Sequence, residues 1–144
     1  MTISSVPDGF HTITPNVIVD RVDEAIDFYK TAFGAEEIMR LTVPDGRVVH
    51  CELKFGDSRV NVGVAMDGWP AHALLAQIFV DDSDVTFKRL VDAGCKVLTQ
   101  VTDMFFGFRE GRVVDPFGNT WTVSTRKEEV SHAEMQRRLN AAFS

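Results

Sequence analysis

The stretch Val17-Ile-Val-Asp-Arg-Val-Asp23 decides the fold, because a similar stretch recurs later in the chain as Ile78-Phe-Val-Asp-Asp-Ser-Asp84. Each is an apolar strand that ends in acidic residues and runs into an amphipathic helix pattern. The helices are expected to stop at Gly34 and Gly94, since glycine readily takes the left-handed conformation of a helix C-terminus. A repeat of this kind indicates a duplicated structural unit.

Further matches follow each predicted helix. The tetrapeptide Gly-Arg-Val-Val occurs at 46–49 and again at 111–114, and Phe-Gly turns follow at Phe55 and Phe117. The segment Val49 to Leu53 alternates apolar and polar residues, as a half-buried strand does. The sequence therefore predicts two β-α-β-β-β modules. In this interpretation Arg112 is the repeat equivalent of an exposed Arg47.

Composition limits the class of protein. The chain has 144 residues, with 15 Lys and Arg against 21 Asp and Glu, giving a net charge of −6. That charge disfavours nucleic acid or an anionic membrane as a partner. No apolar run is long enough to span a membrane, no signal peptide is visible, and the two cysteines form no metal or disulfide motif. We expect a soluble, cytoplasmic protein.

The predicted organisation is a single domain with two extensions. Residues 1–9 read as a flexible tail, 10–126 as the domain with modules at 10–64 and 74–126, and 127–144 as a C-terminal helix. Ser131 can cap this helix, with Glu134 completing a capping box. The apolar stripe of the helix packs either on the same chain or on a second subunit. The stripe consists of Met135, Leu139, Ala142 and Phe143.

Three segments carry a resemblance to a known family: Pro7-Asp-Gly-Phe-His-Thr-Ile-Thr-Pro15, Ala25-Ile-Asp-Phe-Tyr-Lys-Thr-Ala-Phe-Gly34 and Asp115-Pro-Phe-Gly-Asn119. In a paired βαβββ arrangement they resemble the vicinal oxygen chelate superfamily, which includes glyoxalase I, extradiol dioxygenases and bleomycin-resistance proteins. The PhnB-like, glyoxalase-like branch is the most similar. The resemblance implies an α+β fold whose eight mixed strands curl around a cavity with the helices outside, and it implies a homodimer.

The same resemblance implies a divalent metal held by one residue on the first and one on the last strand of each module. Those positions fall on Thr14, Leu75, near Asn61 and on Thr122, and none is a usual ligand for a catalytic divalent ion. We therefore expect no cofactor and no metal. A displaced metal site that uses His50, Glu52 or Gln77 remains the alternative. His50 and Glu52 otherwise act as polar wall residues.

Period-two alternation places a polar face on the first and last strands. Thr14 and Thr122 are expected to face inward, with Ile13, Val17, Trp121 and Val123 packing against the helices. Such a face indicates a solvated or ligand-filled concavity, or else a water-exposed surface. The residues that accompany Thr14 and Thr122 are Thr12, Asn16, Gln77, Thr120 and Ser124.

The segment Met104-Phe-Phe-Gly-Phe-Arg109 adds aromatic rings and a guanidinium. Phe105, Phe106 and Phe108 are either core residues or a stacking surface for a planar ligand, and Arg109 can bind a carboxylate or phosphate.

Two functions stay open: a protein that binds a small organic molecule without metal, which the vacant ligand positions favour, and a metal-dependent lyase or dioxygenase. Metal-free acid–base chemistry with Glu52, or more weakly His50, as the catalytic group belongs to the second class. The residues expected to contact a ligand are Thr14, Asn16, His50, Glu52, Asn61, Gln77, Phe106, Phe108, Arg109, Thr120 and Thr122.

Overall fold

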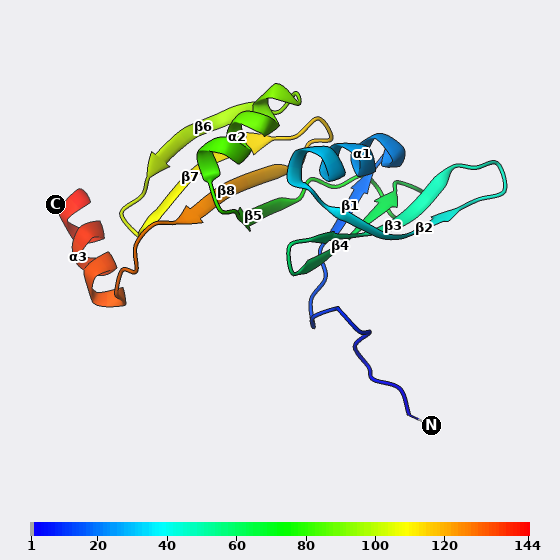
Figure 1. Cartoon of the computed structure of the whole chain (residues 1–144), viewed down its shortest axis with the longest axis horizontal. Coiled ribbons are helices and arrows are strands. Elements are labelled where there is room, and N and C mark those ends of the chain that lie inside the picture. The colour runs from blue at the N-terminus through cyan, green and yellow to red at the C-terminus, as the bar shows by residue number, and fades with distance from the viewer. Residues whose placement is uncertain (1) are drawn as a thin grey trace. The chain divides into compact units, whose positions relative to one another are not determined.

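The computed structural model describes residues 2–144 and contains two compact units, one ending at Leu74 and the other beginning at Leu75. Figure 1 shows the helices and strands of each unit. Unit 1 contains β1 (Asn16–Val19), α1 (Val22–Phe33), β2 (Glu36–Thr42), β3 (Val48–Phe55) and β4 (Ser58–Val64). Unit 2 contains β5 (Leu75–Phe79), α2 (Ser83–Asp92), β6 (Lys96–Asp103), β7 (Phe108–Val114), β8 (Thr120–Arg126) and α3 (His132–Ala142).

The two units share one topology. Unit 1 has a four-stranded sheet in the order β1-β4-β3-β2, and unit 2 has a four-stranded sheet in the order β5-β8-β7-β6. The first and last strands of each module pair in parallel, and the other pairs are antiparallel. The predicted α+β class, the two βαβββ modules and the C-terminal helix are confirmed. The eight strands form two separate sheets, and neither sheet closes on itself.

Each module buries one helix face against its own sheet. In α1, every predicted apolar position from Val22 to Ala32 is buried, and Gly34 ends the helix in the left-handed conformation with φ 69° and ψ 27°. Asp82 caps α2 by accepting a hydrogen bond from the backbone N–H of Val85, and Phe87 and Leu90 are buried beneath that helix. The hydrophobic core of each unit therefore lies between the helix and one face of the sheet.

The N-terminal end of unit 1 differs from expectation. Strand β1 begins only at Asn16, so Thr12 and Thr14 precede it, and Ile13 is 82% exposed instead of packing against a helix. Pro15 explains the late start, because proline has no N–H to donate to a strand ladder. Its carbonyl still accepts a hydrogen bond from the backbone N–H of Asn61 at 3.0 Å.

The second Gly-Arg-Val-Val copy is not structurally equivalent to the first. Cys51 lies opposite Val62, and Gly111 lies opposite Val123, where Val62 and Val123 pair with the repeated positions Val17 and Ile78. The first tetrapeptide enters β3 from a turn, whereas the second ends β7. The expected equivalence of Arg112 and Arg47 is therefore wrong.

By the same pairing, Glu110 of unit 2 corresponds to His50 of unit 1, and Arg112 corresponds to Glu52.

The C-terminal helix has the predicted cap. The Ser131 hydroxyl accepts a hydrogen bond from the backbone N–H of Glu134 at 3.1 Å. Arg138 ties α3 to the rest of unit 2 by donating to the Phe105 carbonyl at 2.9 Å and to the Glu128 carboxylate at 2.8 Å. Phe143, at the end of the apolar stripe, remains 84% exposed. Of the stripe, Met135 and Leu139 are half-buried, and Ala142 and Phe143 are exposed.

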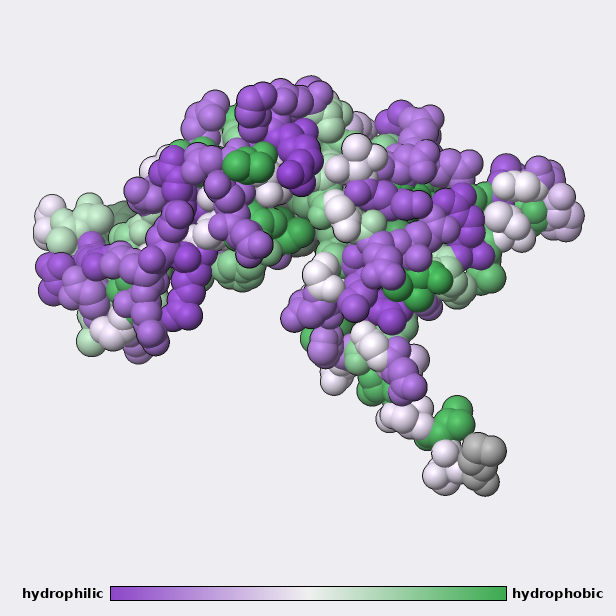
Figure 2. All heavy atoms as spheres, viewed as in Figure 1, coloured by the Kyte–Doolittle hydropathy of each residue, from purple (hydrophilic) through white to green (hydrophobic). Residues whose placement is uncertain are grey.

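Hydrophilic residues cover most of the visible surface of both units, and smaller hydrophobic areas lie among them (Figure 2). Within residues 2–144, the helices are too short or too polar to cross a bilayer.

Gly111 provides a test of the register. A Cβ atom at this position lies 2.8 Å from Cε2 of Phe87 and 3.0 Å from the Thr99 carbonyl oxygen. Because a ring and a backbone must both move, Gly111→Ala should lower the free energy of unfolding by about 1–3 kcal/mol. At Gly63, in β4, the nearest atom is the side-chain end of Ile18 at 3.3 Å, so Gly63→Ala should cost less. Urea denaturation measures both, and equal losses would contradict this packing.

Candidate functional site

The face of the second sheet that points away from α2 carries a hydrogen-bonded polar network. The Gln77 amide donates to the Ser124 hydroxyl at 3.0 Å, and that hydroxyl donates to the Glu110 carboxylate at 3.0 Å. The Gln77 amide also lies 3.5 Å from the same carboxylate oxygen. The polar face predicted for Gln77, Thr122 and Ser124 is present, and Trp121 and Val123 are buried as expected.

A second cross-strand contact continues this face. Nε of Arg112 donates to the Thr122 hydroxyl at 3.1 Å, and the two residues lie directly opposite each other on β7 and β8. Sequence reasoning missed Glu110 altogether. It took Arg112 as an exposed residue, which it is, but did not place it opposite Thr122. The signal that could have identified both is strand alternation counted from the last strand, where Thr122 and Ser124 fix the partners on β7.

Aromatic rings extend the polar face toward the C-terminal helix. Phe79 contacts Phe108 edge to face with ring centroids 5.2 Å apart, and Phe108 contacts Phe106 in the same way at 5.2 Å. Phe105 continues the row at 5.1 Å. Phe79, at the start of this row, is 58% exposed although it is a large apolar side chain.

The row leads into an apolar pocket of about 420 Å³ between α3 and the segment that carries Phe105 and Phe106. The lining residues are Phe105, Phe106, Phe108, His132, Met135, Gln136 and Leu139. A pocket with aromatic walls and a few polar groups at its edge is the usual form of a small-molecule site.

Arg109 occupies a different position from the one expected. Its guanidinium forms a two-pronged ion pair with Asp84, at 2.7 and 3.1 Å, and a third contact with Asp103 at 3.2 Å. The hydrogen bonds from Arg109 hold the pKa of Asp84 below its usual range. These contacts join β7 to α2 and β6, so a ligand anion has to compete with two carboxylates for this guanidinium.

In unit 1, the predicted residues Asn16 and His50 line one pocket of about 440 Å³. The turn that carries Met66 and Trp69 forms another wall of this pocket. Thr14 lies outside it and accepts a hydrogen bond from the Asn16 amide through its carbonyl oxygen. Asn16 and His50 therefore come together, whereas Thr14 contributes backbone only.

Glu52 and Asn61 lie beside a cation that sequence reasoning did not single out. Nη1 of Arg59 is 3.7 Å from the Glu52 carboxylate, and the Phe10 ring covers the same guanidinium at 5.1 Å. Oδ1 of Asn61 and Nε of Arg59 are buried without a hydrogen-bond partner. Glu52 is therefore an ion-pair partner in unit 1, and its charge is compensated.

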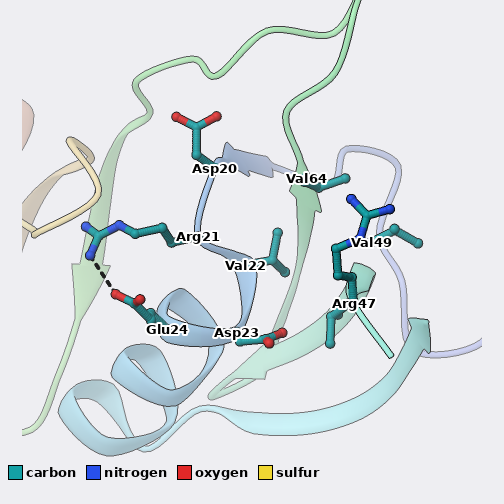
Figure 3. Close-up of a pocket in the computed structure, with 9 residues that line it drawn as sticks. Asp20, Arg21, Val22, Asp23, Glu24, Arg47, Val49 and Val64 are labelled. Carbon is teal, nitrogen blue, oxygen red and sulfur yellow. Dashed lines mark hydrogen bonds and ion pairs between the residues drawn. The ribbon is translucent and has the colours of Figure 1, made fainter. Parts of the chain in front are cut away.

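Another pocket in unit 1, of about 240 Å³, lies where β1 runs into α1. Figure 3 shows Asp20, Asp23 and Glu24 around it, with Arg47 facing them across the opening. Arg21 pairs with Glu24 at 2.6 Å, and Arg47 pairs with Asp45 at 2.9 Å. These pairs are exposed, so they contribute little stability and leave the pocket well solvated.

Neither cysteine is activated. Burial raises the pKa of the Cys51 thiol to about 11 and that of Cys95 to about 12. Both thiols remain protonated at neutral pH, and a thiol in that state is a poor nucleophile and a poor metal ligand.

The residues at the implied metal positions do not suit a catalytic divalent ion. Thr14 precedes β1, and Leu75 is an exposed apolar residue at the start of β5. Asn61 on β4 and Thr122 on β8 offer an amide and a hydroxyl in place of imidazoles and carboxylates. Within the part of the chain from residue 2 onward, three or more His, Cys, Asp or Glu side chains nowhere gather closely enough to hold a metal.

Comparisons with known proteins give the family. A sequence model of the Glyoxalase/Bleomycin resistance protein/Dioxygenase superfamily matches residues 9–123. A Mycobacterium bovis protein that is named only as uncharacterized is 31% identical over 143 residues, which cover 90% of this chain and 92% of that protein.

Two solved structures are similar in fold. An Arabidopsis thaliana gene product is 28% identical with a TM-score of 0.64, covering 80% of this chain and 98% of that one. TioX from Micromonospora has a TM-score of 0.71 at 21% identity, covering 81% of this chain and 98% of that one, and shares the fold. The chain belongs to the glyoxalase/bleomycin resistance protein/dioxygenase superfamily.

Proposed function

We propose that the chain binds a small amphipathic organic molecule on unit 2, without the metal ion of its superfamily. The observation that carries this proposal is an apolar pocket with one wall residue on the same strand face as the hydrogen-bonded polar network. Phe108 lines the pocket and stands two residues before Glu110 on the same face of β7. A ligand can therefore place a ring among the phenylalanines and a polar group at the network.

Two features support a binding role over a structural one. Phe79 exposes an apolar ring directly beside buried polar groups, and a contact surface of this kind usually marks an interaction site. The amide of Gln77 and the hydroxyl of Ser124 are held in place by each other, so they lose little freedom when a ligand binds. We also place the chain in the PhnB-like branch, on the strength of its segment from Pro7 to Pro15.

The alternative is a metal-dependent lyase or dioxygenase with a displaced site. His50, Glu52 or Gln77 would supply its ligands. Glu52 is paired with Arg59, His50 lines a pocket with Trp69, and the Gln77 amide donates to Ser124. The arrangement of unit 1 favours the metal-free proposal.

Elemental analysis separates these two proposals. Protein purified without chelators should contain far less than one equivalent of Ni, Zn, Fe or Mn, because amides and hydroxyls do not retain these ions at neutral pH. Dialysis against a chelator should leave the melting temperature unchanged. A stoichiometric metal that chelation removes, with loss of stability, would favour the enzyme.

Phe106→Ala should weaken ligand binding. A thermal-shift screen of planar amphipathic compounds identifies a ligand, and calorimetry then measures its affinity for each variant. Loss of one aromatic contact is worth about 1 kcal/mol, which is roughly a fivefold rise in Kd.

Two controls sharpen this test. Leu98→Ala removes an exposed apolar side chain of β6 outside the pocket and should leave Kd unchanged. Arg109→Ala should lower the melting temperature, because it breaks the contacts with Asp84 and Asp103, and should change Kd little. Unchanged affinity in Phe106→Ala would place the binding site elsewhere.

We also propose that the chain forms a homodimer, supported by the exposed end of the apolar stripe on α3 at Phe143. Sedimentation equilibrium at micromolar concentration should give twice the mass of the chain, and Phe143→Ser should shift the equilibrium toward monomer. A single monomeric species at these concentrations would refute the dimer.

A further inference from the structure

Glu110 holds a carboxylate that unit 2 does not neutralise. The residue is only 8% exposed, and no Lys, Arg or His of the described chain lies within ion-pair distance of it. Both of its hydrogen bonds arrive at Oε1, from Ser124 and Gln77, while Oε2 accepts none from the described residues and is not sealed from solvent. A largely buried carboxylate without a nearby cation favours a positively charged or N–H donor group that binds at its open oxygen.

Arg112 holds the complementary charge two residues along the same strand. Only its Nε is engaged, by the Thr122 hydroxyl, and none of the acidic residues described pairs with its guanidinium. Glu110 and Arg112 are neighbours on one face, yet they do not pair with each other, because each is bound to the hydroxyl directly opposite it on β8. Ser124 and Thr122 thus keep the two charges separate.

The strand fixes the order of the three groups. Phe108, Glu110 and Arg112 alternate onto the same face of β7, with about 7 Å between successive members. The chemistry along this line is aromatic, then anionic, then cationic. A ligand that matches it carries a ring, then a cation, then an anion.

The equivalent positions of unit 1 carry other side chains. His50 stands where unit 2 has Glu110, and Glu52 stands where it has Arg112. The Glu52 carboxylate has Arg59 beside it at 3.7 Å, so its charge is already compensated. The topology therefore does not require the uncompensated charges of unit 2.

We propose that the ligand of unit 2 is an aromatic compound in which an ammonium group lies between the ring and a carboxylate, as in an aromatic α-amino acid. The ring lies against Phe79 and Phe108, the ammonium donates to Oε2 of Glu110, and the carboxylate accepts from the free end of Arg112. This inference rests on the binding function proposed above and names the class of ligand.

Four probes test it by ¹H–¹⁵N chemical-shift titration of the full chain. L-phenylalanine carries both charges, L-phenylalaninamide only the cation, and N-acetyl-L-phenylalanine only the anion. 4-(Aminomethyl)benzoate carries both charges with the ring between them. For ligands of this size, L-phenylalanine should bind with Kd on the order of 1 mM, and the other three about tenfold more weakly.

The variants should change these preferences selectively. Glu110→Gln should abolish the preference for L-phenylalanine over N-acetyl-L-phenylalanine and keep the preference over the amide. Arg112→Gln should abolish the preference for L-phenylalanine over L-phenylalaninamide and keep the preference over N-acetyl-L-phenylalanine. Arg47→Gln removes an exposed guanidinium of unit 1 and should alter neither ratio. If Glu110→Gln does not fold, Ser124→Ala serves in its place, because it frees the carboxylate and should reduce the same preference by a smaller factor.

The inference is overturned if L-phenylalanine shows no binding at about 10 mM, or if the two charge variants leave all four affinities in the wild-type ratio. Should the charge preferences be absent while Phe106→Ala still weakens a ligand found by screening, only the class of ligand is wrong. Should Phe106→Ala also have no effect, the proposed function fails with it.

Discussion

The parallel pairing of the first and last strand of each module is the constraint on which the rest of the structure depends. In unit 2, Ile78 lies opposite Val123, which turns Trp121 and Val123 toward α2 and Thr122 and Ser124 toward the other face. A slip of one residue would exchange these two sets. Gly111 holds the register on the neighbouring strand, because only a glycine fits beneath the ring of Phe87.

Much of this could be predicted from sequence because the signals are local and periodic. The repeated apolar strand with its acidic end, the spacing from Val22 to Ala32 and the glycine at the helix end are each read within a few turns of chain. The fold follows from them. The site is harder to predict, because it depends on which residue of one strand lies opposite which residue of another.

The Gly-Arg-Val-Val repeat illustrates that difficulty. The identical tetrapeptides made Arg112 the expected counterpart of Arg47, but one copy leads into a strand and the other ends one. The pairing of β7 with β8 shows Arg112 beside Thr122 and Glu110 beside Ser124. Arg109 illustrates the same limit from another side, because its partners Asp84 and Asp103 come from elements that the sequence alone does not bring together.

Gln77 and Thr122 connect the family relationship to the proposed ligand. They stand on the strand pair where the superfamily resemblance places metal ligands, and here they serve as hydrogen-bonding groups. Thr122 accepts from Arg112, and Gln77 donates to Ser124, which in turn donates to Glu110. A metal centre binds a ligand by attracting its oxygen atoms to one positive charge. Side chains that hold a carboxylate and a guanidinium apart instead present two opposite charges at a fixed separation, and such a surface selects a ligand by the order and spacing of its own charged groups.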